Sequence, residues 1–197
     1  MVSDTEVRAA DPRRVIVAMT GATGTIYGVR ALELLKAAGI ETHLVVSKWA
    51  ARTLTHETSY SVDQVTALAT EVHPAGDLGA PIASGSFVTV GMLVVPCSMR
   101  TLGAIANGVG DNLIHRAADV VLKERRQLVL AVQETPFSPI HLENMLKLSR
   151  LGVAIVPPVP AFYTRPAAIE DLVNYTVARL LDQMGIHVET AARWSGF

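Results

Sequence analysis

Short continuous runs of Val, Ile and Leu recur along this chain, separated by segments whose apolar residues have helical spacing. Uninterrupted apolar runs are typical of strands buried on both faces, and amphipathic helices between them are typical of a covered parallel sheet. We therefore predict an α/β fold built on one parallel sheet. The expected strands are 15–19, 43–46, 92–95, 128–132 and 153–156. The expected helices are 26–38, 48–57, 98–106, 114–126, 140–151 and 168–184, with a shorter helix in 62–70 that Ser61 can cap together with Gln64.

The size of the chain, 197 residues, predicts one domain at 14–197, preceded by a flexible N-terminal tail at 1–13 without the apolar stretch of a targeting peptide. No apolar run approaches the ~18 residues of a membrane span, and a formal charge of −1 offers no general attraction for nucleic acid or an anionic membrane. The single cysteine, Cys97, indicates a reducing, cytoplasmic location. The histidines show no metal-ligand spacing, so no metal is expected. The low share of charged residues, 18%, suggests apolar surface buried between subunits.

The run 15–24 joins one predicted strand to a helix through a turn of glycine and threonine. The first N–H groups of a helix lack partners and carry the positive end of its dipole, so such a turn can hold an anion such as phosphate. Thr20, Thr23 and Thr25 add hydroxyl donors. The turn lacks both the G-x-G-x-x-G spacing and the Walker lysine, so nothing in it supports NAD or ATP. A tight turn without a ligand has the same sequence, and both interpretations stay open.

The predicted strands all end in turns rich in hydroxyls, glycine or proline. Ligands of open parallel sheets bind outside the carboxyl ends of the strands. The same kind of turn at several strand ends is stronger evidence for a ligand site than a single motif. We therefore expect the functional site at this edge, from the connections 20–25, Ser47, 96–101, 133–136 and 157–163.

Individual residues near this edge allow both a functional and a structural interpretation. Ser98 can hold a ligand or cap the helix that follows it, and Glu134 can act as a general acid or base or cap the next helix. Tyr163, together with an arginine, can hold a phosphate or belong to ordinary surface. Trp194, near the C-terminus, is typical of a lid or an oligomer contact. Cys97 is expected to be a small buried apolar residue rather than a nucleophile.

Two cations share one face of a predicted helix. Arg116 and Lys123 lie seven residues apart in the sequence. Asp119 lies between them, so a solvated ion-pair ladder explains the same pattern, and from the residues alone this explanation is favoured. Arg125 and Arg126 end the predicted helix, where cations suit the dipole.

Six blocks of sequence between Arg14 and Trp194, in order and with few gaps, resemble the UbiX-type flavin prenyltransferase family. They are MTGATG (19–24), PCS (96–98), RAADVVLKERR (116–126), ETP (134–136), IHLENML (140–146) and PAFY (160–163). The third and fifth blocks are highly specific. The GATG turn, SGSF (84–87) and VPCSM (95–99) are most similar to the members of this family that are encoded beside non-oxidative hydroxyarylic acid decarboxylases.

The resemblance implies a single Rossmann-like, flavodoxin-like flavoprotein domain, usually assembled as a homododecamer. It implies transfer of a dimethylallyl group from dimethylallyl monophosphate to N5 and C6 of reduced FMN, and use of the product by a UbiD-type decarboxylase. Residues that match the FMN site are Gly21, Ala22, Thr23, Ser47, Ser98, Met99, Arg100 and Thr101, with Arg116, Gln133 and Trp194 as further candidates. Residues that match the donor-phosphate site are Lys123, Glu134, Tyr163 and Arg179, and the candidate catalytic residues are Glu134, Lys123 and Glu57. Cations there would neutralise the leaving phosphate. Formation of the second bond, from flavin C6, requires removal of a proton, for which Glu134 or the departing phosphate could serve.

Two positions depart from the family's pattern. Thr23 replaces a common serine and keeps the hydroxyl. Gln133 replaces an arginine, and the loss of one charge-assisted bond to phosphate would cost ~1.5–3 kcal/mol unless Arg100 compensates. This departure keeps open the alternative of an FMN carrier or scaffold subunit of an aromatic acid decarboxylase. A peptidyl-cysteine decarboxylase is disfavoured, because the first helix lacks a histidine and PIASGS (81–86) replaces the block Pro-Ala-Ser-Ala-Asn-Thr.

Overall fold

Six parallel strands form the centre of the structure, a computed structural model that describes residues 13–190, 193, 194 and 196. They are β1 (Arg14–Met19), β2 (Glu41–Val46), β3 (Glu71–Val72), β4 (Gly91–Cys97), β5 (Gln127–Val132) and β6 (Ala154–Ile155), in the order β3-β2-β1-β4-β5-β6. The chain moves outward from β1 to β3 and then returns to place β4 beside β1. The direction of winding therefore reverses between β1 and β4, and ligands of such sheets bind in the crevice at the carboxyl ends of the two strands.

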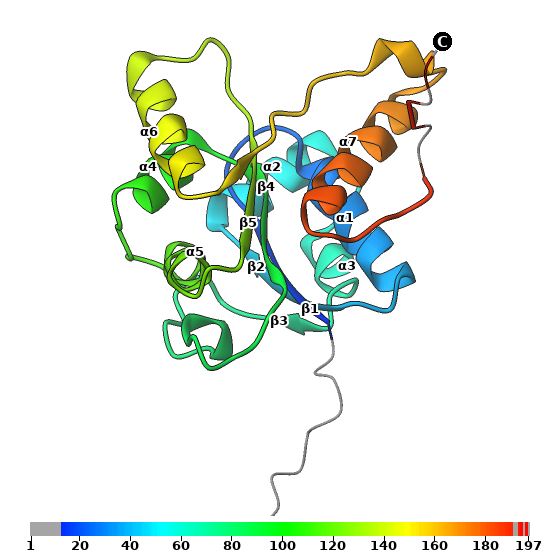
Figure 1. Cartoon of the computed structure of the whole chain (residues 1–197). Helices are drawn as coiled ribbons and strands as arrows, with labels where there is room; N and C mark the ends of the chain where they lie inside the picture. Colours follow the sequence, from blue (N-terminus) through cyan, green and yellow to red (C-terminus); the bar gives the residue numbers. More distant parts are fainter. Residues whose placement is uncertain (1–12, 191–192, 195, 197) are drawn as a thin grey trace, which may run out of the picture.

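Helices cover both faces of this sheet (Figure 1). One face carries α1 (Thr25–Ala37), α2 (Lys48–Glu57), α3 (Val62–Thr66) and α7 (Ile169–Gln183). The other face carries α4 (Met99–Ala106), α5 (Leu113–Lys123) and α6 (Pro139–Arg150). Two short 3-10 helices, η1 (Pro81–Ala83) and η2 (Phe162–Thr164), lie in connecting segments. The predicted α/β class with a doubly covered parallel sheet is confirmed.

Alternate side chains of the central strand β1 enter two separate cores. Val15, Val17 and Met19 pack with the core of α1 and α7, whereas Ile16 and Ala18 pack with the core of α4 and α5. Side chains of a strand point alternately to the two faces, so a strand covered on both sides must be apolar throughout. This is why β1 appears in the sequence as an unbroken apolar run.

One boundary error lies at the end of α5, which was expected to reach residue 126. The helix ends at Lys123. Arg125 has a left-handed backbone with φ of 56°, and the Arg126 guanidinium donates to the carbonyl oxygens of Phe87 (2.7 Å) and Gly85 (2.6 Å). Both arginines therefore lie beyond the helix, and Arg126 fixes the loop that precedes β4.

Other differences have local causes. The helix expected within 62–70 covers only Val62–Thr66, with the predicted capping box of Ser61 and Gln64. The strand β3 was not predicted, because two exposed residues are too few to make a pattern. The tail expected at 1–13 falls, except for Arg13, outside the described residues. No helix of the part described here has the length and apolar character needed to cross a membrane.

Gly28 allows α1 to pack closely on the sheet, and we expect Gly28→Ala to destabilise the fold. A Cβ there would lie 2.7 Å from the Val95 carbonyl oxygen and 2.8 Å from the Met19 Cε. Such crowding costs about 1–3 kcal/mol and outweighs the gain in helix propensity. Urea unfolding followed by circular dichroism measures the change. Gly76→Ala is the control, since nothing lies within 4 Å of a Cβ there, and an equal loss in both variants would refute the packing argument.

Candidate functional site

A buried threonine joins the two loops that flank the crevice. The Thr20 hydroxyl donates to the Pro96 carbonyl oxygen (2.8 Å) and accepts from the Ser98 backbone N–H (2.8 Å). Only 2% of Thr20 is exposed. The expectation that Thr20 donates to a bound anion is therefore wrong, because its hydroxyl has both partners inside the protein. Its role is to tie the β1–α1 loop to the β4–α4 loop.

The N-terminus of α1 binds a carboxylate of the protein itself. Glu57, the last residue of α2, accepts through Oε2 from the N–H groups of Gly24 (3.0 Å) and Thr25 (3.2 Å) and from the Thr25 hydroxyl (3.0 Å). Partial burial opposes ionisation of Glu57, but hydrogen bonds from Thr23, Thr25 and Gly24 outweigh it and lower its pKa. The prediction that the Thr25 hydroxyl and these amides hold a ligand's phosphate is wrong, because Glu57 satisfies the same unpaired donors.

The accessible part of this loop, 21–23, lies at the sheet edge where two other helices begin. Ser47 caps α2 by accepting from the Ala50 N–H (3.1 Å), and Ser98 caps α4 by accepting from the Thr101 N–H (3.4 Å). The capping interpretation of Ser98 is thus confirmed. Both serines directly follow strands that end at this edge, so the positive ends of α2 and α4 are available to an anion in the crevice.

An exposed indole stands against the glycine of the loop. Trp49 is 60% exposed, and a Cβ on Gly21 would lie 2.5 Å from the Trp49 Cβ, so only glycine leaves room for the contact. The sequence prediction missed Trp49, although its place just after Ser47 was a usable signal. A flat exposed ring, an open glycine loop and two helix N-termini fit a planar, phosphorylated cofactor of the FMN type.

A cavity of about 420 Å³ opens beside this loop at the end of β5. It is lined by Thr23, Val132, Gln133, Glu134, Thr135, Phe137, Pro157, Pro158 and Val159. The exposed Glu134 carboxylate accepts from the Thr135 backbone N–H (3.1 Å). The cap of α6 is Ser138, which forms a capping box with His141. The helix-cap interpretation of Glu134 is therefore wrong, and its second carboxylate oxygen remains available to a ligand.

A second cavity, of about 400 Å³, lies between η2 and the end of α7. It is lined by Tyr163, Tyr175, Ala178, Arg179, Asp182, Arg193 and Trp194. The Tyr163 hydroxyl donates to the Tyr175 hydroxyl (2.9 Å), and the Trp194 ring meets the Tyr163 ring edge-on at 5.3 Å. The structure thus brings together Tyr163, Arg179 and Trp194. The sequence prediction missed Tyr175, Asp182 and Arg193, of which only Asp182 had a signal, its i+3 spacing from Arg179.

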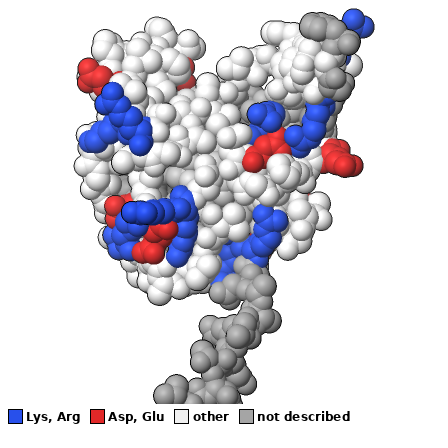
Figure 2. Space-filling model, viewed as in Figure 1, with Lys and Arg blue, Asp and Glu red and all other residues white. Residues whose placement is uncertain are grey.

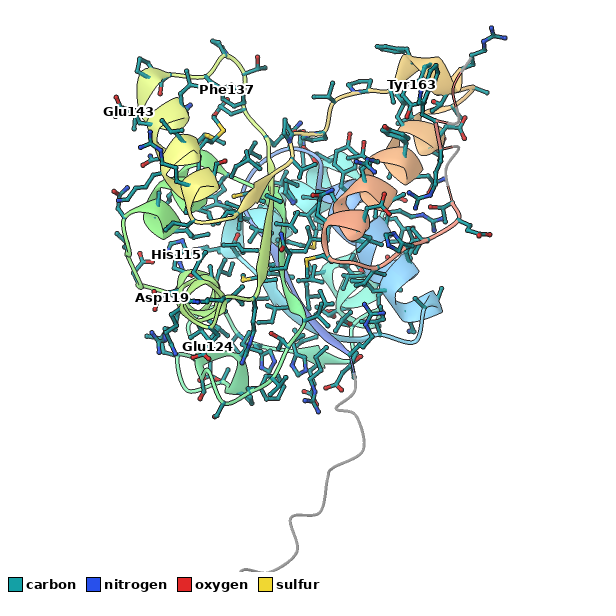
Figure 3. All side chains as sticks on the ribbon, viewed as in Figure 1. His115, Asp119, Glu124, Phe137, Glu143 and Tyr163 are labelled. Carbon is teal, nitrogen blue, oxygen red and sulfur yellow. The ribbon has the colours of Figure 1, made fainter. Side chains whose placement is uncertain are left out.

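The two cavities lie on opposite sides of one hollow. Phe137 and Tyr163 stand at the same end of the molecule on separate lobes (Figure 3). The space-filling view shows the surface hollowed between these lobes, which are formed by α6 on one side and by η2 with α7 on the other (Figure 2). One residue of each cavity, Phe137 and Tyr163, therefore flanks the same hollow.

Lys123 and Arg116 do not join these residues within one chain. Lys123 ends α5, the helix that leads to the first residue of β5, and it pairs with Glu124 at the amino edge of the sheet. Glu124 lies at the end of the molecule opposite Phe137 and Tyr163 (Figure 3). Arg116 donates to Asp119 (2.8 Å) and to the Ala83 carbonyl oxygen (3.2 Å). Part of the predicted ion-pair ladder is present, because Arg116 and Asp119 are paired.

Other predicted residues of the edge have interactions of their own. The exposed Arg100 lies 3.7 Å from Asp111, and the half-buried Met99 packs against the core. The Gln133 backbone N–H donates to the Cys97 carbonyl oxygen (3.2 Å), which ties the ends of β4 and β5 together. Cys97 is buried, and burial raises the pKa of its thiol to about 12. The prediction of a small buried residue rather than a nucleophile is confirmed.

Known proteins are similar to this chain in sequence and in fold. The profile of the Flavoprotein family matches residues 3–181. A probable UbiX-like flavin prenyltransferase of Bacillus subtilis (strain 168) is 56% identical over 183 residues, which are 93% of this chain and 90% of that protein.

Two solved structures are similar over nearly their whole length. AnUbiX (PadA1), crystallised with FMN and dimethylallyl pyrophosphate, has a TM-score of 0.93 and 53% identity, covering 94% of this chain and 99% of that one. A dodecameric FMN-dependent UbiX-like decarboxylase from Escherichia coli O157:H7 has a TM-score of 0.91 and 55% identity, covering 93% and 100%.

Proposed function

The chain belongs to the UbiX-type flavin prenyltransferase family, and we propose on this basis that it joins a dimethylallyl group from dimethylallyl monophosphate to N5 and C6 of reduced FMN. The product, prenylated FMN, serves a UbiD-type decarboxylase. The observation that carries the proposal is the arrangement at one sheet edge, where an open glycine loop beside Trp49 adjoins the Glu134 cavity, at the end of the molecule that also carries Tyr163. These residues come from separate segments of the chain, so no single sequence motif contains all of them.

The FMN site in this proposal is formed by the loops at the crevice. The residues that hold the cofactor are Gly21, Ala22, Thr23, Ser47, Ser98, Met99, Arg100 and Thr101. The N-termini of α2 and α4 attract its phosphate, and the exposed indole of Trp49 offers a surface for a flat ring. Reduced FMN supplies the nucleophilic ring atoms, a chemistry that the side chains do not provide.

The donor phosphate in this proposal is bound by Tyr163 and Arg179. A phosphate monoester carries about −1.5 to −2 charge near neutral pH, and a guanidinium binds it through short charge-assisted hydrogen bonds. Lys123 matches a phosphate-binding residue of the family but lies at the opposite edge of the same chain, and Arg116, a further candidate, is paired with Asp119 and the Ala83 carbonyl oxygen. We infer that a neighbouring subunit supplies them, in a homo-oligomer like the dodecamer of the Escherichia coli relative.

Glu134 is the proposed general base. Closure of the second bond, at C6, requires the loss of a proton, and a base must reach it from within the site. The Glu134 carboxylate is exposed in a cavity that also contains Thr23 of the cofactor loop. The single cysteine fits the further proposal that these steps take place in the cytoplasm.

The test is anaerobic incubation of the full chain with FMN, dithionite and dimethylallyl monophosphate, followed by mass spectrometry of the released flavin. We expect a flavin heavier by one dimethylallyl unit. Glu134→Gln should reduce its formation at least ~100-fold, since general base catalysis contributes 10²–10⁴-fold. Glu143→Gln, at an exposed position of α6, is the matched control and should leave formation unchanged. Unmodified FMN from the wild-type protein would contradict the proposal.

Gln133 favours one alternative function, that of an FMN carrier for an aromatic acid decarboxylase. It lines the Glu134 cavity as a neutral amide, where the family usually has a guanidinium. If the wild-type protein retains FMN without modifying it, Gln133→Arg should create prenyl transfer. Modification by the wild-type protein excludes the carrier function.

A further inference from the structure

One buried carboxylate gathers hydrogen-bond donors from α7 and from the C-terminal segment. Asp182, whose side chain is 7% exposed, accepts from Arg179 Nη1 (2.8 Å), His187 Nδ1 (2.8 Å) and both Nη atoms of Arg193 (2.9 and 3.0 Å). Hydrogen bonds from Arg193, opposed by burial and aided by His187, lower the pKa of Asp182 to about 2. The carboxylate is therefore charged at every pH at which the protein is expected to work.

The two arginines use this carboxylate differently. Arg193 binds it with both Nη atoms, so its guanidinium is fixed as a fork and anchors the C-terminal segment to α7. Arg179 donates to Asp182 only through Nη1, and no acceptor among the described residues is hydrogen-bonded to its Nη2 or Nε. Because two guanidinium groups face one carboxylate, these three side chains carry a net positive charge. Arg179 can therefore bind an anion while Asp182 still holds it in place.

The anchor also determines the aromatic wall of the cavity. Trp194 directly follows Arg193, and its ring meets the Tyr163 ring edge-on. Tyr163 in turn donates to the Tyr175 hydroxyl on α7. Arg193 thus anchors the segment from which the indole extends, and Asp182 holds Arg193. Without the carboxylate, two like charges would repel each other at the place where the C-terminal segment meets the helix.

We propose that Asp182 is a positioning residue for the donor site: it directs Arg179 toward the donor phosphate and, through Arg193, holds Trp194 against Tyr163 as the apolar wall beside the dimethylallyl group. This inference rests on the proposed function. It assigns Asp182 no contact with FMN or with the reacting atoms. Its removal should therefore weaken donor binding and leave the cofactor in place.

The experiment uses the FMN-loaded full chain and the variants Asp182→Asn, Asp182→Glu, Arg193→Gln and the double variant Asp182→Asn/Arg193→Gln. Calorimetry measures the Kd of dimethylallyl monophosphate, and anaerobic assays measure KM and kcat. We expect Asp182→Asn to raise Kd and KM at least ~10-fold with little change in kcat or FMN content, since it removes the charged hydrogen bond that orients the phosphate-binding guanidinium. Asp182→Glu should recover part of the affinity. Asp171→Asn, the same change at the start of α7, is the control.

The double variant separates positioning from a direct role. If Asp182 acts through Arg193, the double variant binds the donor no more weakly than Asp182→Asn. A donor Kd within twofold of wild type in Asp182→Asn, additive losses in the double variant, or a parallel loss of FMN each overturns the inference. If the wild type binds the donor without transferring the prenyl group, the proposed function fails, and the donor Kd of the variants still decides the role of Asp182. If the wild type does not bind the donor, both fail.

Discussion

Lys123→Ala is expected to reduce prenyl transfer at least ~100-fold while FMN stays bound. In the proposed reaction a phosphate of charge about −2 leaves, and removing one preorganised charged donor from such a site costs 10²–10³-fold in rate. Lys123 also has no place in the crevice of its own chain, because α5 ends at the amino edge of the sheet. Its loss should therefore spare the cofactor loops. Rates come from the anaerobic assay, and FMN content from the absorbance of the purified protein.

Mixed oligomers test where Lys123 acts. If each site takes Lys123 from a neighbouring subunit, oligomers assembled from Lys123→Ala and Tyr163→Phe chains contain some sites with both native residues. Random mixing makes this fraction about one quarter. Activity should thus return when the two variants are unfolded and refolded together, but not when they are simply mixed. Arg125→Ala removes a neighbouring exposed cation as the control. Refolded mixtures that stay inactive would contradict a shared site.

The position of Lys123 could have been predicted from the sequence, because it follows from the topology alone. A crossover helix between two parallel strands must return the chain to the amino edge before the next strand begins. Lys123 stands at the end of such a helix, and Glu134 stands after the strand that follows. The resemblance grouped these residues because they match one family site. The fold separates them within a chain, and only an assembly can bring them together.

Contacts between distant segments could not be predicted from local patterns. The apolar runs and caps identify β1, α2 and their neighbours because those signals span a few residues. The contact of Glu57 with Gly24 and that of Asp182 with Arg193 depend on where separate elements meet. The sequence therefore predicts the edge that carries the site. It does not show that a carboxylate fills the N-terminus of α1.

Glu57→Ala is expected to weaken FMN binding by ~10- to 100-fold. The carboxylate accepts from two backbone N–H groups and one hydroxyl at the start of α1, and it thereby shapes the loop whose accessible part is 21–23. Charged hydrogen bonds of this kind are worth about 1.5–3 kcal/mol each, and their loss leaves Gly24 and Thr25 without acceptors. Titration of the apoprotein with FMN, followed by quenching of flavin fluorescence, measures the affinity.

Glu57→Gln and the pH dependence distinguish this positioning role from catalysis. The amide keeps the shape and one acceptor but not the charge, so its FMN affinity should fall between those of wild type and Glu57→Ala. The folded-state pKa of Glu57 is lowered from 4.5, so its stabilisation of the loop is complete above about pH 4.5 and is lost as the pH falls through the lowered pKa. Wild-type affinity should therefore fall toward that of Glu57→Gln in acid. If both variants bind FMN as tightly as the wild type but no longer transfer the prenyl group, the loop forms without Glu57. That result would contradict the positioning role and would make Glu57 a residue of the chemical step.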